Sequence, residues 1–192
     1  MATRIGIFGG TFDPIHNGHI DLAKKALKKI DLDEIIFIPT YLTPHKIGVK
    51  ITPAIHRYNM ARLAVSGVKG LKVSDMEIKR KGHSYSVDTL RTLRRKIDRS
   101  AEIFFITGSD SLRDIDKWKD LDKILELCEF VIVKRPGFIL KSMRREFTVI
   151  DIKAKDISAS AVRERVKQGL SIANLVPKKV QSYIKSKRLY LK

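Results

Sequence analysis

The sequence predicts an α/β fold in which a doubly wound, mostly parallel sheet carries helices on both faces. Short runs rich in β-branched and aromatic residues alternate with longer segments of helical periodicity, the pattern of a parallel sheet with crossover helices. A glycine-rich turn follows the first of these runs directly. The chain has no internal repeat, low-complexity tract or Gly/Ser linker, and its 192 residues suit one domain, so a single domain over 1–192 is expected.

The first part of the chain predicts three strands separated by two helices. Proline suits the first turn of a helix because its missing N–H would have no partner there. The elements expected here are a strand over Arg4–Phe8, a helix over His19–Ile30 with apolar residues on one face, a strand over Glu34–Ile38 ended by Pro39, a helix that begins at Pro53, and a strand over Leu71–Ser74.

The second part continues the alternation and ends in two helices. Glycine or proline follows two of its apolar strands and marks their ends. The elements expected here are a helix over Ser86–Ile97, a strongly apolar strand over Glu102–Thr107 that turns at Gly108, a helix over Leu121–Leu127, strands over Phe130–Val133 and Phe147–Ile152, and helices from about Ser160 and Pro177. In open sheets of this kind ligands bind outside the carboxyl ends of the strands. Chemistry is therefore expected in the loops after the first, second, fourth and sixth strands.

The charge is strongly basic, with 39 Lys and Arg against 21 Asp and Glu and a net charge of +18. Such a balance attracts polyanions, so nucleic acid is a candidate partner. The basic residues are nevertheless spread along the chain without interleaved aromatic residues, which favours solvated faces and an anionic small substrate over a nucleic-acid surface. No apolar run reaches membrane-span length, no signal peptide is recognised, and the lone Cys128 sits among apolar residues. A cytoplasmic protein without membrane contact is expected.

The turn after the first strand carries the strongest functional signal, Gly9-Gly10-Thr11-Phe12-Asp13-Pro14-Ile15-His16-Asn17-Gly18-His19. Two glycines allow a tight turn close to a phosphate. At three-residue spacing His16 and His19 fall on one side of a helical turn, where they can donate hydrogen bonds to phosphoryl oxygens beside the helix N-terminus. A zinc site is the rival interpretation, but no third ligand lies in register; two ordinary histidines are the other.

A second anion site is predicted at the segment 157–163, which follows the last strand. Ser158 or Ser160 would cap the new helix, and Arg163 would lie on its first turn. Free N–H groups, hydroxyls and a guanidinium together suit phosphate oxygens. The alternative is a plain helix cap beside a solvated arginine.

These two motifs resemble those of the nucleotidylyltransferase superfamily, and the chain as a whole is similar to bacterial nicotinate-nucleotide adenylyltransferases. His-x-Gly-His and the late serine-rich stretch that ends in Arg identify only the superfamily. The segments that carry the narrower resemblance are Pro44-His45-Lys46, Tyr85–Leu90, Gly108-Ser109-Asp110, Trp118, Arg135-Pro136-Gly137 and Val176–Tyr190. Ile15, Ala159 and Lys119 depart from the residues that are common in the family.

The resemblance implies a Rossmann-like fold, roles for individual residues and the identity of both substrates. ATP would be bound by Gly9, Gly10, Thr11, Phe12, His16, His19, Gly108, Asp110, Ile157, Ser158, Ser160 and Arg163, and nicotinate mononucleotide by Thr11, Lys46, Ser86, Thr89, Trp118 and Arg135. His16, His19, Lys46 and Arg163 would be catalytic, and no residue would be a dedicated metal ligand. Taken singly, Trp118 could equally pack in the core, Lys46 could be solvated and Asp110 could cap a helix.

The implied reaction is direct attack of the acceptor phosphate on the α-phosphorus of ATP, with pyrophosphate as the leaving group. A phosphate monoester is already anionic at neutral pH, so the reaction needs alignment and charge stabilisation rather than a general base. Mg²⁺ bound to triphosphate oxygens is expected. The alternatives are an enzyme of the same fold that uses nicotinamide mononucleotide or pantetheine phosphate, and a basic nucleic-acid-binding protein. Assembly into a homo-oligomer is left open.

Overall fold

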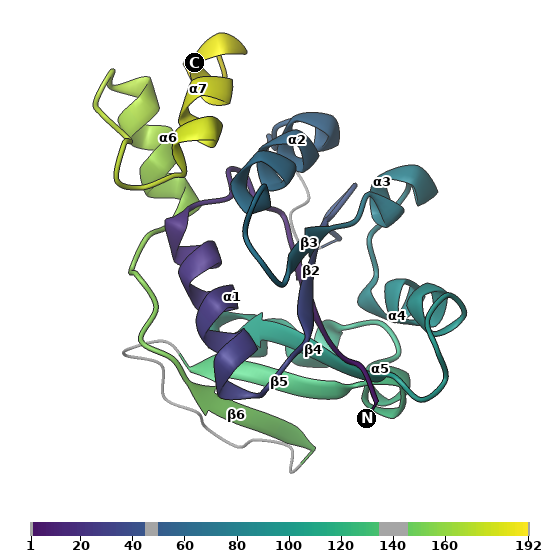
Figure 1. Cartoon of the computed structure of the whole chain (residues 1–192). Helices are drawn as coiled ribbons and strands as arrows, with labels where there is room; N and C mark the ends of the chain where they lie inside the picture. The colour runs from purple at the N-terminus through teal and green to yellow at the C-terminus, as the bar shows by residue number, and fades with distance from the viewer. Residues whose placement is uncertain (1, 45–49, 135–145, 192) are drawn as a thin grey trace.

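The computed structural model describes residues 2–44, 50–134 and 146–191 and contains one six-stranded sheet (Figure 1). Its strands lie in the order β3-β2-β1-β4-β5-β6, and the five pairings between them are all parallel. The strands are β1 (Arg4–Gly10), β2 (Glu34–Pro39), β3 (Leu71–Val73), β4 (Glu102–Gly108), β5 (Glu129–Lys134) and β6 (Phe147–Asp151). The predicted α/β fold with a doubly wound sheet is confirmed.

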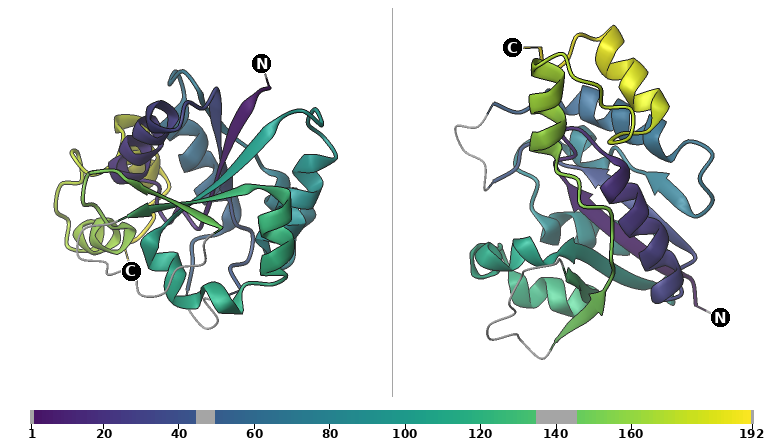
Figure 2. Two further views of the ribbon diagram at one scale, coloured as in Figure 1. Left: turned by 90° about the horizontal axis from the view of Figure 1, so that it is seen from below. Right: turned by 90° about the vertical axis from the view of Figure 1, so that its left-hand side faces the viewer.

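Helices cover both faces of this sheet, as the two views of Figure 2 show. They are α1 (Asn17–Lys29), α2 (Ala54–Val65), α3 (Met76–Arg80), α4 (Ser86–Arg94), α5 (Leu121–Leu127), α6 (Ala159–Lys167), α7 (Lys178–Ser186) and the 3₁₀ helix η1 (Ser109–Lys117). The sequence did not predict α3 or η1. A five-residue helix is too short to show an amphipathic repeat, and a 3₁₀ helix repeats every three residues.

Alternate residues of the central strands enter two separate cores. Phe104 and Ile106 of β4 face a core that α1, α2 and α7 cover, whereas Ile103 and Phe105 face the core beneath α4 and α5. Successive strand side chains point to opposite faces, so a strand buried on both sides is apolar throughout. This explains why 103–106 is continuously apolar in the sequence.

The strand order places the change of direction between β1 and β4. From β1 the chain winds outward through β2 to β3, and it then returns to place β4 on the other side of β1. Ligands bind at such a point because the loops on its two sides diverge and leave a crevice. The loops after β1, β2 and β4 therefore surround one region at the carboxyl edge of the sheet. No helix in the part of the chain that the structure describes is long and apolar enough to cross a membrane.

Candidate active site at the carboxyl edge of the sheet

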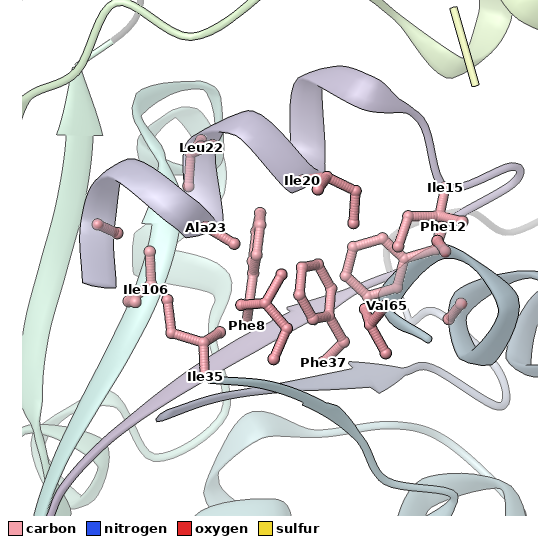
Figure 3. Close-up of a cluster of buried hydrophobic side chains, with 14 of the residues drawn as sticks. Phe8, Phe12, Ile15, Ile20, Leu22, Ala23, Ile35, Phe37, Val65 and Ile106 are labelled. Carbon is pink, nitrogen blue, oxygen red and sulfur yellow. The ribbon is translucent and has the colours of Figure 1, made fainter. Parts of the chain in front are cut away.

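The loop between β1 and α1 is anchored in the core by an aromatic side chain. Phe12 has a φ of +49°, a region that costs a bulky residue about 1–3 kcal/mol. Its ring is nevertheless buried, at centroid distances of 5.7 Å from Phe8 and 5.5 Å from Phe37. Figure 3 shows these three rings together beneath α1. Burial of the ring stabilises the backbone conformation that turns the chain back toward the start of α1.

The two histidines of the turn form a stacked pair at the start of α1. Their ring centroids are 3.6 Å apart, and His16 is buried. The backbone N–H of His16 donates to Nδ1 of His19 at 3.3 Å. Because Nδ1 accepts this bond, the proton of the neutral His19 ring resides on Nε2. The Phe12 ring packs edge-on against His19 at 5.1 Å and fixes the plane in which this Nε2–H donor lies.

Gly18 is required by its surroundings rather than by its own backbone angles. A Cβ at this position would lie 2.8 Å from the carbonyl oxygen of Lys155 and 3.0 Å from Nδ1 of His16. Real Cβ atoms do not approach other atoms so closely, so a side chain would displace the His16 ring or the segment after β6. The glycine between the two histidines thus allows α1 to pack against the segment that leads into the second predicted anion site.

The segment after β6 brings its serines and arginine to the same region. Ser158 is the N-cap of α6, and its hydroxyl accepts from the Ala161 N–H at 3.1 Å and lies 3.1 Å from the Ser160 hydroxyl. Arg163 donates to the backbone carbonyl of Asp13 at 2.7 Å. The guanidinium from the far end of the sequence therefore contacts the loop that carries the histidines.

Two hollows lie among the residues that the sequence assigns to ATP. A cavity of about 130 Å³ is lined by His16, Gly18, His19 and residues of the segment 154–157, including Ile157. An open groove of about 1250 Å³ is lined by Ser158, Ser160 and Arg163. The sequence reasoning had not included three further cations along this groove, Lys50, Lys167 and Arg188. Together these basic groups and the two serine hydroxyls suit a polyanionic ligand.

A third cavity of about 300 Å³ lies on the other side of the same loop. The residues proposed for acceptor binding that line it are Thr11, Ser86, Thr89 and Trp118, together with Gly9 and Gly10 of the glycine-rich turn. Trp118 is half-buried and contacts Phe105 and Phe130 edge-on, each at 5.7 Å. It is thus held in place while still forming part of the cavity wall, and a flat ring could pack against it.

A buried acid that the sequence reasoning missed supports this cavity. Glu77 of α3 is 5% exposed and accepts a hydrogen bond from the Thr89 hydroxyl at 2.5 Å. The Arg80 guanidinium in turn donates to that hydroxyl at 3.2 Å. Burial raises the pKa of Glu77 above its ordinary value of 4.5. Since Thr89 already donates its proton to Glu77, this hydroxyl supports the cavity wall and does not offer a donor to a ligand.

A buried arginine is the second residue that the sequence reasoning missed. Arg57 of α2 is 1% exposed and makes four hydrogen bonds to backbone carbonyls around the crevice. Its neighbours His56, Tyr58 and Asn59 are polar or amphipathic, so the sequence offered no sign that this arginine is buried. Glu77 offered no signal either, because α3 has too few residues to show a buried face.

Some predicted residues cannot be placed in this geometry. Lys46 and Arg135 lie outside the described residues, as does the side chain of Asp110, which belongs to η1. Gly108 is buried at the end of β4.

Within the described residues no group of three or more His, Cys, Asp or Glu side chains could hold a metal ion. Burial raises the pKa of the Cys128 thiol to about 12, which keeps it protonated at neutral pH.

We predict that Gly18→Ala impairs catalysis more than it impairs folding. The added Cβ would push the His16 ring or the Lys155 carbonyl out of place, and misplacing a catalytic group by about 1 Å can cost about a hundredfold in rate. We expect kcat to fall about tenfold to a hundredfold while thermal unfolding stays cooperative. A variant with wild-type kcat would show that the close packing at Gly18 has no part in the site.

We also predict that Glu77→Gln changes the pH dependence of stability. Because the pKa of Glu77 is raised in the folded chain, the folded chain retains a proton between the unfolded and folded pKa values, so wild-type stability falls as pH rises through this window. Gln has no such titration, so the stability of the variant relative to wild type should rise with pH. Thermal midpoints from about pH 4 to about pH 8 test this.

Glu126→Gln is the matched control for that experiment, since Glu126 is exposed on α5. Its pH profile should follow that of the wild type. Parallel profiles for Glu77→Gln and the wild type would instead mean that the carboxyl does not titrate differently in the folded chain.

Comparison with known proteins finds matches over most of the chain. Residues 7–165 match the family model described as cytidylyltransferase-like. A Clostridium tetani (strain Massachusetts / E88) protein named "Probable nicotinate-nucleotide adenylyltransferase" is 40% identical over 195 residues, which cover 96% of this chain and 97% of the relative. A protein of the same name from Desulfitobacterium hafniense (strain DSM 10664 / DCB-2) is 41% identical over 198 residues, which cover 97% and 95%.

The fold is also found among solved structures. The Plasmodium falciparum nicotinic acid mononucleotide adenylyltransferase complexed with NaAD superposes with a TM-score of 0.79 at 22% identity, over 98% of this chain and 97% of that one. The same enzyme complexed with APC gives a TM-score of 0.80 at the same identity and coverage. From the family model and the relatives at about 40% identity, the chain belongs to the cytidylyltransferase-like family and, within it, to the nicotinate-nucleotide adenylyltransferases.

Proposed function

We propose that this protein transfers AMP from ATP to nicotinate mononucleotide and forms deamido-NAD and pyrophosphate, a step of NAD biosynthesis. The observation that carries the proposal is that one loop serves two cavities. Gly10 and Thr11 line the cavity that contains Trp118, and His16 and His19 line the cavity beside the segment after β6. A reaction that joins two nucleotides needs two adjoining sites with a shared phosphate-binding wall.

The names of the relatives support this choice of substrates. The curated proteins cited above are named for adenylyl transfer to nicotinate nucleotide, and the Plasmodium enzyme of the same fold was solved with NaAD. Nicotinamide mononucleotide and pantetheine phosphate are the alternative acceptors. A phosphopantetheine arm has no aromatic ring to stack, whereas the wall formed by Trp118 suits one.

On the ATP side, we assign the two histidines and Arg163 to the phosphates. The Nε2–H of His19 would donate to oxygens of the reacting phosphate, with the N-terminus of α1 adding positive potential. Ser158, Ser160 and Arg163 would hold the β- and γ-phosphates that leave as pyrophosphate. Lys46 would add positive charge from the loop after β2. Asp110, beside Gly108, would hold the ribose.

On the acceptor side, we assign the pyridine ring to the face of Trp118. Ser86 is the first residue of α4, so its hydroxyl and the free N–H groups of that helix start could bind an anionic group of the mononucleotide. Thr89 would shape the wall through Glu77. Arg135 would act near the acceptor.

The chemistry then rests on alignment. The acceptor phosphate attacks the α-phosphorus opposite the bridging oxygen, the new P–O bond forms as the bond to pyrophosphate breaks, and no proton has to be removed from the nucleophile. Holding both reactants in line can supply about 7–11 kcal/mol of the barrier. Donors fixed around the α-phosphate add stabilisation as its charge is redistributed.

Magnesium would accompany ATP without a dedicated protein cage. The groove proposed for the triphosphate is lined by hydroxyls, cations, apolar side chains and two carboxylates. Asp13 already accepts from the Thr52 N–H and the Tyr190 hydroxyl, and Glu164 accepts from the Gln168 amide at 2.7 Å. Mg²⁺ prefers oxygen ligands and retains several waters, so the residues fit a metal bound by phosphate oxygens. When bound, the ion would neutralise charge on the triphosphate.

We further propose that the protein is a single domain that acts in the cytoplasm. Whether copies of the chain associate stays open.

Pyrophosphate release from ATP, measured with each acceptor in turn, tests the function. We expect turnover with nicotinate mononucleotide and much slower turnover with nicotinamide mononucleotide or phosphopantetheine. Preference for either of the latter would replace the proposed acceptor while leaving adenylyl transfer in place. Salt-dependent binding to generic DNA or RNA without any adenylyl transfer would instead favour a nucleic-acid-binding protein, as the charge of +18 alone suggests.

We predict that His19→Ala lowers kcat by about 10²- to 10³-fold, the usual effect of removing one donor to a developing charge. Binding of ATP should change far less, because Arg163 and the helix starts remain. His56→Gln is the control, since His56 lies on α2 and bonds the Tyr183 hydroxyl away from the crevice. Wild-type turnover of His19→Ala would remove this histidine from the mechanism.

We predict that Trp118→Ala raises the KM of the acceptor about three- to tenfold, which corresponds to ~0.5–1.5 kcal/mol of lost stacking. The KM of ATP should stay near its wild-type value, because the tryptophan lies on the acceptor side. Steady-state kinetics with each substrate varied in turn would separate the two effects. An unchanged acceptor KM would rule out stacking on this ring.

A further inference from the structure

Arg57 is a buried cation in a position that the proposed mechanism has not yet used. It projects from α2 and, at 1% exposure, is the largest of the fully buried side chains among the described residues. Burial lowers the pKa of its guanidinium from 12.5, and the nearby negative charges of Asp13 and Glu77 oppose this shift. An arginine nevertheless keeps its positive charge. Because burying a charge costs free energy, a buried arginine normally has a specific structural or functional role.

The hydrogen bonds of Arg57 connect three segments that are distant in sequence. Its Nε donates to the Thr52 carbonyl at 2.8 Å and Nη1 to the Thr11 carbonyl at 2.7 Å. Nη2 donates to the carbonyls of Thr40 and Tyr41 at 2.7 and 3.1 Å. One planar group thus fixes the loop after β1, the loop after β2 and the start of α2 relative to one another.

No acidic side chain among the described residues forms an ion pair with Arg57. The carboxylate of Asp13 instead accepts from the Thr52 N–H at 3.1 Å and from the Tyr190 hydroxyl at 2.6 Å. A guanidinium that bonds only to neutral carbonyls gains no ion-pair energy, but its several donors satisfy four backbone acceptors at once. The value of the guanidinium here lies in the geometry that its fork imposes on these carbonyls.

The bond to the Thr11 carbonyl sets the direction of the next amide. Within the described residues Asp13–Pro14 is the only cis peptide, so the Thr11–Phe12 peptide is trans and its N–H points away from its C=O. The Phe12 N–H is therefore directed away from the buried guanidinium. Among the described residues no backbone carbonyl accepts a hydrogen bond from it, and a phosphate oxygen is the acceptor that the proposed reaction would supply.

The same arginine links the walls of the two substrate sites. Its partners Thr11 and Thr40 line the 300 Å³ cavity, whereas its partner Thr52 lines the groove that contains Arg163. The Thr43 hydroxyl lies 3.3 Å from that of Thr11 and 3.0 Å from that of Thr40. A carbonyl that accepts from a cation also makes the N–H of its peptide a stronger donor, because hydrogen bonds in series polarise one another.

We infer that Arg57 is a positioning residue for adenylyl transfer, which holds the Thr11–Phe12 peptide with its N–H toward the α-phosphate of ATP and fixes the acceptor-side loop at the same time. This inference rests on the proposed function. It requires Arg57 to act on kcat through backbone groups, without touching either substrate.

Arg57→Lys provides the first test because it keeps the charge but cannot bond all three segments. We expect kcat to fall about tenfold or more, with both KM values within about threefold of wild type, since the binding groups themselves remain. Arg57→Ala should be slower still, and added guanidinium chloride in the low millimolar range should restore part of its kcat. Arg62→Lys is the matched control, since Arg62 is exposed on the same helix, and it should behave as wild type.

The two diastereomers of ATPαS provide a readout that a merely structural residue would not change. If the Phe12 N–H donates to one non-bridging α-oxygen, wild type should prefer the diastereomer that keeps oxygen there, and Arg57→Lys should lose part of that preference.

Wild-type kcat and an unchanged diastereomer ratio in folded Arg57→Lys would overturn the inference. Absence of adenylyl transfer in the wild type would be a failure of the proposed function instead. If Arg57→Lys proves unstable, the guanidinium response of Arg57→Ala decides: a rise in kcat supports positioning, and recovery of folded protein without faster turnover contradicts it.

Discussion

The burial of the Phe12 ring is the interaction on which the rest of the site depends. A phenylalanine with a φ of +49° is held there because its ring packs with Phe8, Phe37 and His19 beneath α1. The hydrophobic core of the sheet thus determines the path of the loop after β1. That path sets the Thr11–Phe12 peptide and the start of α1. The geometry of both proposed substrate sites therefore depends on packing within the core.

Contacts across the chain convert this loop into a fixed wall between two sites. Arg163 reaches the Asp13 carbonyl from α6, the Tyr190 hydroxyl reaches the Asp13 carboxylate from the end of the chain, and Arg57 holds Thr11 from α2. Each contact orders a backbone that would otherwise have to be ordered when the substrates bind. A site prepared in this way can accelerate a reaction by alignment alone, which suits a nucleophile that is already ionised.

Most of the fold was predictable because its signals are local. The apolar runs at 103–107 and 130–133, the Gly9–Gly10 turn and the proline before α2 each mark an element through its own residues. The histidine pair and the serine cap of α6 could also be located, because each lies at a fixed spacing beside the start of a helix. Their convergence followed from the rule that parallel strands end at one edge of the sheet.

Arg57 and Glu77 could not be found in this way, because their roles depend on partners distant in the sequence. Arg57 bonds carbonyls, which every residue possesses, so no residue type marks its partners. Glu77 lies on a five-residue helix, and its burial follows only from the packing of α3 and α4 around the cavity.

The central claim is that alignment within this preformed site moves the adenylyl group directly between the substrates. The stereochemical course at the α-phosphorus, followed with a chiral phosphorothioate of ATP, tests it most directly. Inversion of configuration is the predicted result, and retention would contradict the claim by requiring a covalent adenylyl-enzyme.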